Sequence, residues 1–119
     1  MAITVVSAKW YGKGKRPTDI YIGRPSLLGN PFASKPSKYA KQSVSSDVEA
    51  VREYHCWLQA QWLANSEVKA ELLRLARLYK ETGVLHLICW CKLKANDDTP
   101  CHGDVIKAAI EGIIAKGLV

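Results

Sequence analysis

Hydrophobic residues follow two different spacings along this chain, and the pattern predicts three strands and three helices. β-Branched and apolar residues over 3–8 and 19–23 favour two short strands. A nearly continuous apolar run over 84–91 favours a third strand. Because this run does not alternate with polar residues, we expect it to be covered on both faces, as the interior strand of a short sheet. Segments rich in glycine or proline predict loops over 10–17 and 24–36.

Apolar residues three or four positions apart predict the helices. The first begins at a Ser-x-x-Glu capping box formed by Ser46 and Glu49, the second follows Ser66 and ends at Gly83, and the third occupies about 104–116. The residues expected on their buried faces are Val48, Val51, Tyr54 or His55, Leu58, Trp62, Val68, Leu72, Leu75, Tyr79, Val105, Ile106, Ala109, Ile110 and Ile113. The order β-β-α-α-β-α predicts one small α/β domain over 1–119, with the helices packed on a short central sheet.

Composition and charge limit the classes of binding partner and the cellular compartment that we expect. A net charge of +6 favours an anionic partner. The sequence contains no basic helix with interleaved aromatic residues, which argues against a dedicated nucleic-acid surface. We find no signal-peptide pattern and no apolar run near the ~20 residues that span a bilayer, so we expect a cytoplasmic protein without a membrane segment. The first two predicted helices are rich in tryptophan and leucine, and we expect a homo-oligomer that covers this apolar surface.

The loop after the second predicted strand carries residues suited to a phosphorylated ligand. Arg24 presents a planar guanidinium that can bind phosphate, while Ser26 and Asn30 can hydrogen-bond to a sugar or a base. Gly29 belongs to the same rigid turn. Aromatic rings that could stack on a base are Trp10, Tyr11 and Phe32. The alternative is a surface loop that its prolines hold in place.

A second candidate lies at the start of the last predicted helix, in Cys101, His102, Gly103 and Asp104. The first turn of a helix has free N–H groups that can bind a phosphate, and Gly103 has no side chain to block its approach. If the protein is an enzyme, either Cys101 is the nucleophile or His102 and Asp104 are an acid–base pair. The alternative is that Gly103 or Asp104 only caps the helix and Cys101 packs in the core.

The same region holds a possible set of metal ligands. Cys89, Cys91, Cys101 and His102 could bind zinc, as in a zinc-stabilised interaction module. However, a Cys-x-Cys pair on a straight strand is a poorer chelate than a pair two residues apart on a turn. We therefore expect no metal or cofactor, and expect at least one of the two strand cysteines to be a small buried hydrophobic residue.

Four sequence blocks together resemble a known family. They are YIGRPS at 21–26, GNPF at 29–32, CWCK at 89–92 and CHGD at 101–104. In this combination and order the chain resembles a small uncharacterised domain of bacteria and bacteriophages, in which the link between the last two blocks is usually shorter than here. The resemblance implies the α/β fold, the map of the site and a bacterial or phage origin, and it supplies no reaction.

These observations predict binding of a phosphorylated nucleotide or a nucleotide-derived small molecule, in a pocket at the carboxyl ends of the strands. If the protein is phage-encoded, the pocket could sequester a host nucleotide signal in the host cytoplasm. The alternatives are an enzyme that processes a nucleotide or nucleoside, and the zinc-stabilised interaction module.

Overall fold

A short parallel sheet forms the base of the molecule. The computed structural model describes residues 2–12, 14–24, 26–33, 42–43, 46–89 and 101–119. Strands β1 (Ala2–Ser7) and β2 (Asp19–Tyr21) both pair in parallel with β5 (Val84–Cys89), which lies between them. This confirms the prediction that the apolar run forms an interior strand.

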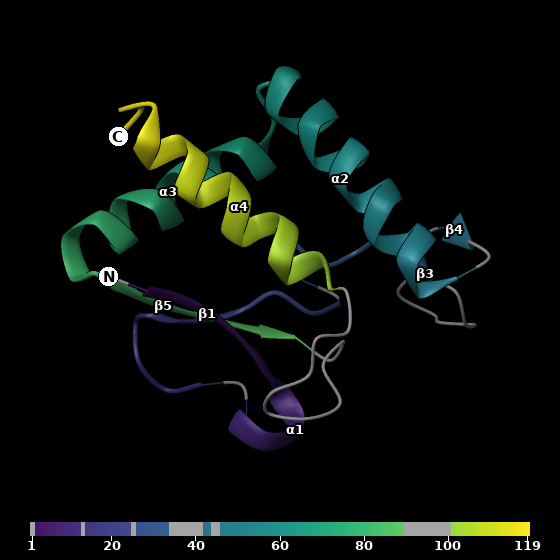
Figure 1. Cartoon of the computed structure of the whole chain (residues 1–119), viewed down its shortest axis with the longest axis horizontal. Coiled ribbons are helices and arrows are strands. Elements are labelled where there is room, and N and C mark those ends of the chain that lie inside the picture. Colours follow the sequence, from purple (N-terminus) through teal and green to yellow (C-terminus); the bar gives the residue numbers. More distant parts are fainter. Residues whose placement is uncertain (1, 13, 25, 34–41, 44–45, 90–100) are drawn as a thin grey trace.

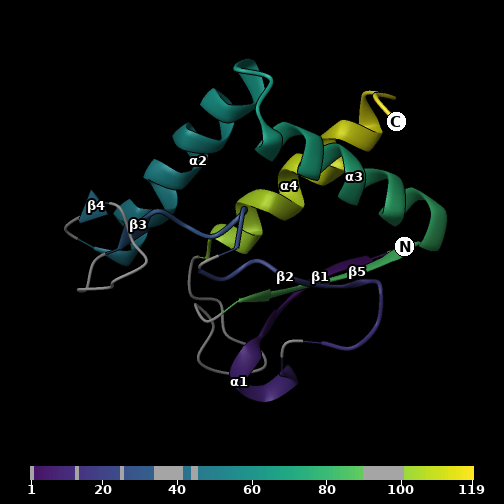
Figure 2. The same ribbon diagram turned by 180° about the vertical axis from the view of Figure 1, so that it is seen from behind.

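The three predicted helices are confirmed, and they lie together on one face of the sheet (Figure 1). They are α2 (Asp47–Leu63), α3 (Glu67–Thr82) and α4 (His102–Ala115). Seen from behind, the same layer of helices stands above the sheet, and the short helix α1 (Ala8–Tyr11) lies on the opposite side (Figure 2). The observed order of the main elements, β-β-α-α-β-α, is the one that the sequence predicts.

Two short elements depart from the predicted loops. Helix α1 begins at Ala8, the last residue of the first predicted strand, and extends into the segment expected to be irregular. The Ser7 hydroxyl accepts a hydrogen bond from the backbone N–H of Lys9 at 3.2 Å and caps its first turn. The second is a ribbon of two-residue strands, β3 (Phe32–Ala33) and β4 (Gln42–Ser43), which pair in parallel beside α2. Neither element changes the order of the sheet.

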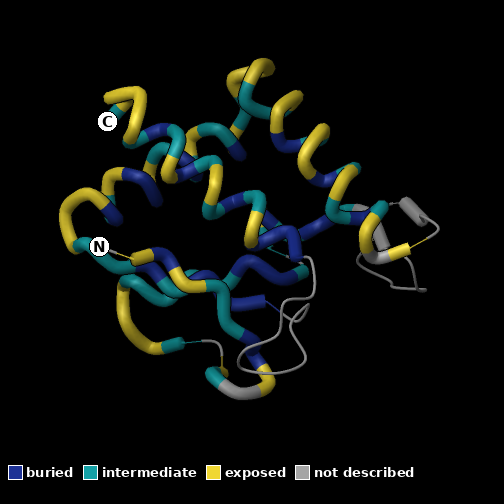
Figure 3. Tube along the Cα trace, in the orientation of Figure 1, coloured by how far each residue is buried: buried dark blue, intermediate teal, exposed yellow. Residues whose placement is uncertain are grey.

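The core lies between the sheet and the helices. Buried segments alternate with exposed ones along each helix, and the buried ones face inward (Figure 3). The predicted faces of α3 and α4 are confirmed, with Val105 and Ala109 at their half-buried margin. Helix α3 ends at Gly83, which adopts the left-handed φ of 78° that a non-glycine residue rarely takes.

The buried face predicted for α2 is partly wrong. Val48 is 53% exposed and His55 is exposed, while Ala50, Tyr54 and Leu58 are buried. The buried residues are four positions apart and form one continuous stripe toward the core, and Val48 lies outside it. In the described part of the chain, no helix is both long enough and apolar enough to cross a membrane.

Candidate functional site

The two predicted ligand-binding segments meet at the carboxyl edge of the sheet. Because all three strands are parallel, the residues that follow β2 and the end of β5 lie at the same edge. The backbone N–H of Ile22 continues the pairing by donating to the carbonyl of Ile88 at 2.8 Å. A ring nitrogen of His102, in the first turn of α4, lies 2.7 Å from the carbonyl oxygen of Ile22. The structure thus brings the loop that begins at Gly23 against the start of α4.

A cleft of about 560 Å³ opens beside this loop. Four of the predicted ligand-binding residues line it, namely Arg24, Ser26, Gly29 and Asn30. The opposite wall comes from the last turns of α2 and the start of α3, and it includes Trp57, Gln61, Ser66, Glu67 and Val68. Sequence reasoning missed this second wall, because nothing in the pattern indicates that the start of α3 packs near Arg24.

Two polar atoms at the cleft have no hydrogen-bond partner among the described residues. They are Nη1 of Arg24 and the hydroxyl oxygen Oγ of Ser26, and both atoms are buried. A buried polar group without a partner is costly, and such groups are rare in native proteins. An acceptor oxygen of a ligand is the kind of partner that each of these atoms lacks.

The loop that carries these two atoms is held firmly against α2. The side-chain amide of Asn30 donates to the carbonyl of Ala50 at 3.2 Å, and the hydroxyl of Tyr54 donates to the carbonyl of Leu28 at 2.7 Å. Both side chains are buried. Asn30 lines the cleft, but its amide nitrogen anchors the loop. Its expected bond to a sugar or base stays a prediction.

The start of α3 forms part of the cleft wall. The side chain of its N-cap residue, Ser66, makes no capping hydrogen bond, and its hydroxyl donates to the carbonyl of Gln61 at 2.9 Å. The first N–H groups of a helix have no partner within the helix, and the helix dipole places a partial positive charge there. Glu67, which is exposed, adds a negative charge at the rim.

None of the predicted residues at the start of α4 lines the cleft. Cys101, His102 and Gly103 are buried, whereas Asp104 is exposed. Cys101 is the N-cap, and its backbone N–H donates to Oδ2 of Asp104 at 3.2 Å, which completes a capping box. Asp104 therefore supports the cap without being the cap residue itself. Gly103 packs against β1 and Ile22. A direct role of this block in ligand binding stays a prediction.

His102 has a defined protonation state. A carbonyl oxygen only accepts hydrogen bonds, so Nε2 must donate its proton to the Ile22 carbonyl. Burial lowers the pKa of His102 below its ordinary value, so the imidazole is neutral at neutral pH and Nδ1 carries a lone pair. Nδ1 lies 3.9 Å from Sγ of Cys101, and the ring of Tyr54 meets the imidazole edge-on at 5.1 Å. This environment holds the tautomer and the orientation of the ring.

The zinc alternative depends on residues that are only partly described. Cys89 and Cys101 are buried, with their sulfur atoms 3.1 Å apart. Cys91 lies outside the described residues, as do the side chains of Trp10 and Phe32 that were expected to stack on a base. Among the described residues no three side chains with metal-ligating atoms are grouped to hold an ion. The burial of Cys89 agrees with its interpretation as a small core residue.

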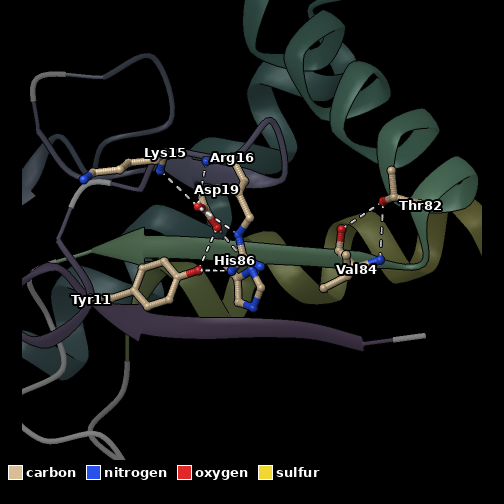
Figure 4. Close-up of polar contacts among 7 residues, drawn as sticks. All are labelled: Tyr11, Lys15, Arg16, Asp19, Thr82, Val84 and His86. Atoms are coloured by element: carbon tan, nitrogen blue, oxygen red, sulfur yellow. Dashed lines mark hydrogen bonds and ion pairs between the residues drawn. The ribbon is translucent and has the colours of Figure 1, made fainter.

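Sequence reasoning missed a polar cluster on the face of the sheet that lies away from α2, α3 and α4 (Figure 4). Asp19 and His86 are register partners on β2 and β5, and Oδ1 of Asp19 lies 3.2 Å from Nδ1 of His86. Tyr11 stacks on the imidazole at 5.4 Å and donates its hydroxyl proton to Asp19. Backbone N–H groups of Arg16 and Lys15 also donate to this carboxylate, and the Arg16 bond is the largest cause of its lowered pKa.

A second cavity, of about 590 Å³, lies between α2 and the end of α4. Its lining is mostly apolar and includes Leu58, Trp62 and Ile113, but none of the predicted ligand-binding residues. Leu63, at the end of α2, borders this cavity and is largely exposed. The expected homo-oligomer stays a prediction.

Comparison with known proteins places most of the chain in one family. A family model described as a domain of unknown function (DUF4326) matches residues 5–112. No curated protein and no solved structure matches the chain.

Proposed function

The chain belongs to the DUF4326 family of domains of unknown function, and from the geometry of the cleft we propose that it binds a phosphorylated nucleotide or a nucleotide-derived small molecule. The observation that carries the proposal is the pair of buried, unpartnered atoms at the cleft, Nη1 of Arg24 and Oγ of Ser26. A phosphate group would accept a charge-assisted hydrogen bond from the first atom and a hydroxyl hydrogen bond from the second.

The electrostatics of the cleft favour an anion at its inner end. Arg24 supplies a permanent positive charge, and the first turn of α3, at the positive end of its helix dipole, lines the same cleft. Glu67 opposes an anion, but its exposed carboxylate is screened by water and salt, whereas the free donor of Arg24 is buried. The phosphate is therefore expected to bind near Arg24 and Ser26, away from the rim.

The rest of the cleft suits the remainder of a nucleotide. Its volume of about 560 Å³ lies in the range of ~300–1,000 Å³ that is usual for small-molecule sites. Trp57 offers an aromatic surface in the same wall, and its ring contacts Tyr54 with centroids 5.4 Å apart. Gln61 adds an amide that can both donate to and accept from a base.

Calorimetric titration with a panel of nucleosides, nucleoside monophosphates, nucleoside diphosphates and cyclic nucleotides tests the proposal. We expect at least one phosphorylated member to bind and its parent nucleoside to bind more weakly. Arg24→Gln should weaken binding by about 10- to 100-fold, because it removes a hydrogen bond to a charged group worth about 1.5–3 kcal/mol. Ser26→Ala should weaken it less.

Two matched variants serve as controls. Arg77→Gln removes a positive charge from an exposed site on α3 away from the cleft and should leave the affinity unchanged. Glu67→Gln removes the opposing charge at the rim and should tighten binding. The proposal is wrong if no member of the panel binds, or if Arg24→Gln and Arg77→Gln bind equally well. If the chain is phage-encoded, the same binding would remove a host nucleotide signal from solution.

A further inference from the structure

Two buried cysteines meet where β5 ends and α4 begins. Cys89 is the last residue of β5 and Cys101 is the N-cap of α4, and neither is exposed. Their sulfur atoms lie 3.1 Å apart, so a displacement of about 1 Å would bring them to the length of a disulfide bond, about 2.05 Å. Neither cysteine is in a disulfide in this structure.

Two groups beside the sulfur of Cys101 would stabilise its thiolate. Nδ1 of His102, which carries a lone pair as argued above, lies 3.9 Å from Sγ of Cys101 and can accept the thiol proton. The backbone N–H of Gly103 donates to the same sulfur at 3.4 Å, in the first turn of a helix whose dipole stabilises a thiolate. The sulfur of Cys89 is the neighbouring thiol that such a thiolate, once oxidised, would meet.

We propose that Cys89 and Cys101 are a redox pair that forms a reversible disulfide, with Cys101 as the first thiol oxidised and His102 as its base. Nδ1 of His102 takes the Cys101 proton, and the thiolate sulfur attacks one oxygen of hydrogen peroxide, which breaks the O–O bond. The departing hydroxide takes the proton back from His102, so this step gives a sulfenic acid and the first water. The sulfur of Cys89 then attacks that of Cys101, and the departing hydroxide leaves with the Cys89 proton as the second water. Two thiols are oxidised and one peroxide is reduced.

The bond would fix the first turn of α4 to the end of the central strand. This turn already contacts the segment before the cleft, because His102 hydrogen-bonds to the carbonyl of Ile22, two residues before Arg24. The inference does not depend on the proposed ligand, since it rests on the sulfur and imidazole geometry alone. Because both thiols are fully buried, their oxidation requires a local opening of this turn. Cys56 is exposed and should therefore react with alkylating agents before either of them.

Mass spectrometry of the full chain tests the pair directly. The protein is treated with hydrogen peroxide, its free thiols are blocked with N-ethylmaleimide, and tryptic peptides are fragmented. We expect a loss of two hydrogens per chain that dithiothreitol reverses, and a crosslink between Cys89 and Cys101. Fragmentation must separate Cys89 from Cys91, because no tryptic site lies between them. The mapping is done on the unaltered chain, so it does not require any variant to fold.

Three variants sharpen the result, each checked for folding by circular dichroism. Cys91→Ser is the matched control and should keep the crosslink, whereas Cys89→Ser should abolish it. His102→Gln keeps an amide donor for the Ile22 carbonyl but loses the basic nitrogen near Cys101, so the disulfide should form at least about tenfold more slowly. The inference is overturned if the crosslink joins another pair, or if no crosslink forms under peroxide that oxidises Cys56.

Discussion

Replacing Gly103 with alanine separates two explanations for this glycine. The sequence indicates a residue that leaves room for a ligand, whereas the structure places it in contact with the core. A Cβ at this position would lie 2.8 Å from Cγ1 of Val5 and 3.0 Å from Cδ1 of Ile22. Carbon atoms in ordinary contact are about 3.5–4.0 Å apart. Val5 is branched at Cβ and cannot easily rotate its methyl groups away.

The structure supports an estimate of the cost. Overpacking of this kind costs about 1–3 kcal/mol. Replacing glycine by alanine within a helix raises the free energy of unfolding by about 1 kcal/mol or less, which offsets part of this cost. We therefore expect Gly103→Ala to lower the free energy of unfolding by about 1–2 kcal/mol. Gly112, in the same helix, has no neighbour within 4 Å of a Cβ, so Gly112→Ala should gain about 0.5–1 kcal/mol.

Urea unfolding followed by tryptophan fluorescence measures the difference between the two variants. We expect Gly103→Ala to be less stable than Gly112→Ala by about 2 kcal/mol, with an unchanged slope against urea for both. If Gly103→Ala is as stable as Gly112→Ala, the first turn of α4 is not packed on β1. That result would favour the explanation that Gly103 leaves space for a ligand.

Three further predictions concern single polar groups. Because hydrogen bonds hold the pKa of Asp19 below its ordinary 3.8, the stability that they provide is present above that pH and is lost as the pH falls below it. Asp19→Asn should flatten this acid dependence in thermal unfolding. Burial lowers the pKa of His102 below 6.5, so as the pH falls below 6.5 this histidine is protonated more readily in the unfolded chain, and the fold loses stability. His102→Gln should remove this part of the dependence of stability on pH. Tyr54→Phe leaves the buried carbonyl of Leu28 without its 2.7 Å partner and should cost about 1–2 kcal/mol in urea unfolding; an unchanged midpoint would contradict this contact.

The order of the elements could be predicted from local signals. The apolar run of β5 lacks alternation because a central parallel strand is covered on both faces, and this property is visible in a single segment. The prediction of the buried face of α2 was less accurate, because several apolar residues of this helix are candidates for burial. Tyr54, and not His55, points inward, where it contacts the loop at Leu28 and the first turn of α4, and no local pattern encodes these contacts.

The site was predictable only in part. Arg24 and Ser26 stand out because a rigid loop after a strand is a common place for ligand contacts. Trp57 and Ser66 are more than thirty residues away in sequence and join the cleft only through the packing of α2 and α3. The pairing of Asp19 with His86 depends on the register of two parallel strands, which no local pattern encodes. Burial of Cys101 likewise follows from how α4 packs on the sheet.

The central claim is that the cleft beside Arg24 holds a phosphorylated ligand, and backbone amide chemical shifts test it most directly. The nitrogen-15-labelled full chain would be titrated with the tightest-binding nucleotide of the panel. The account predicts that the largest shifts cluster on the two cleft walls, around Arg24 to Asn30 and around Gln61 to Val68. Shifts that instead cluster around Asp19 and His86, or along the apolar cavity at the end of α4, would contradict it.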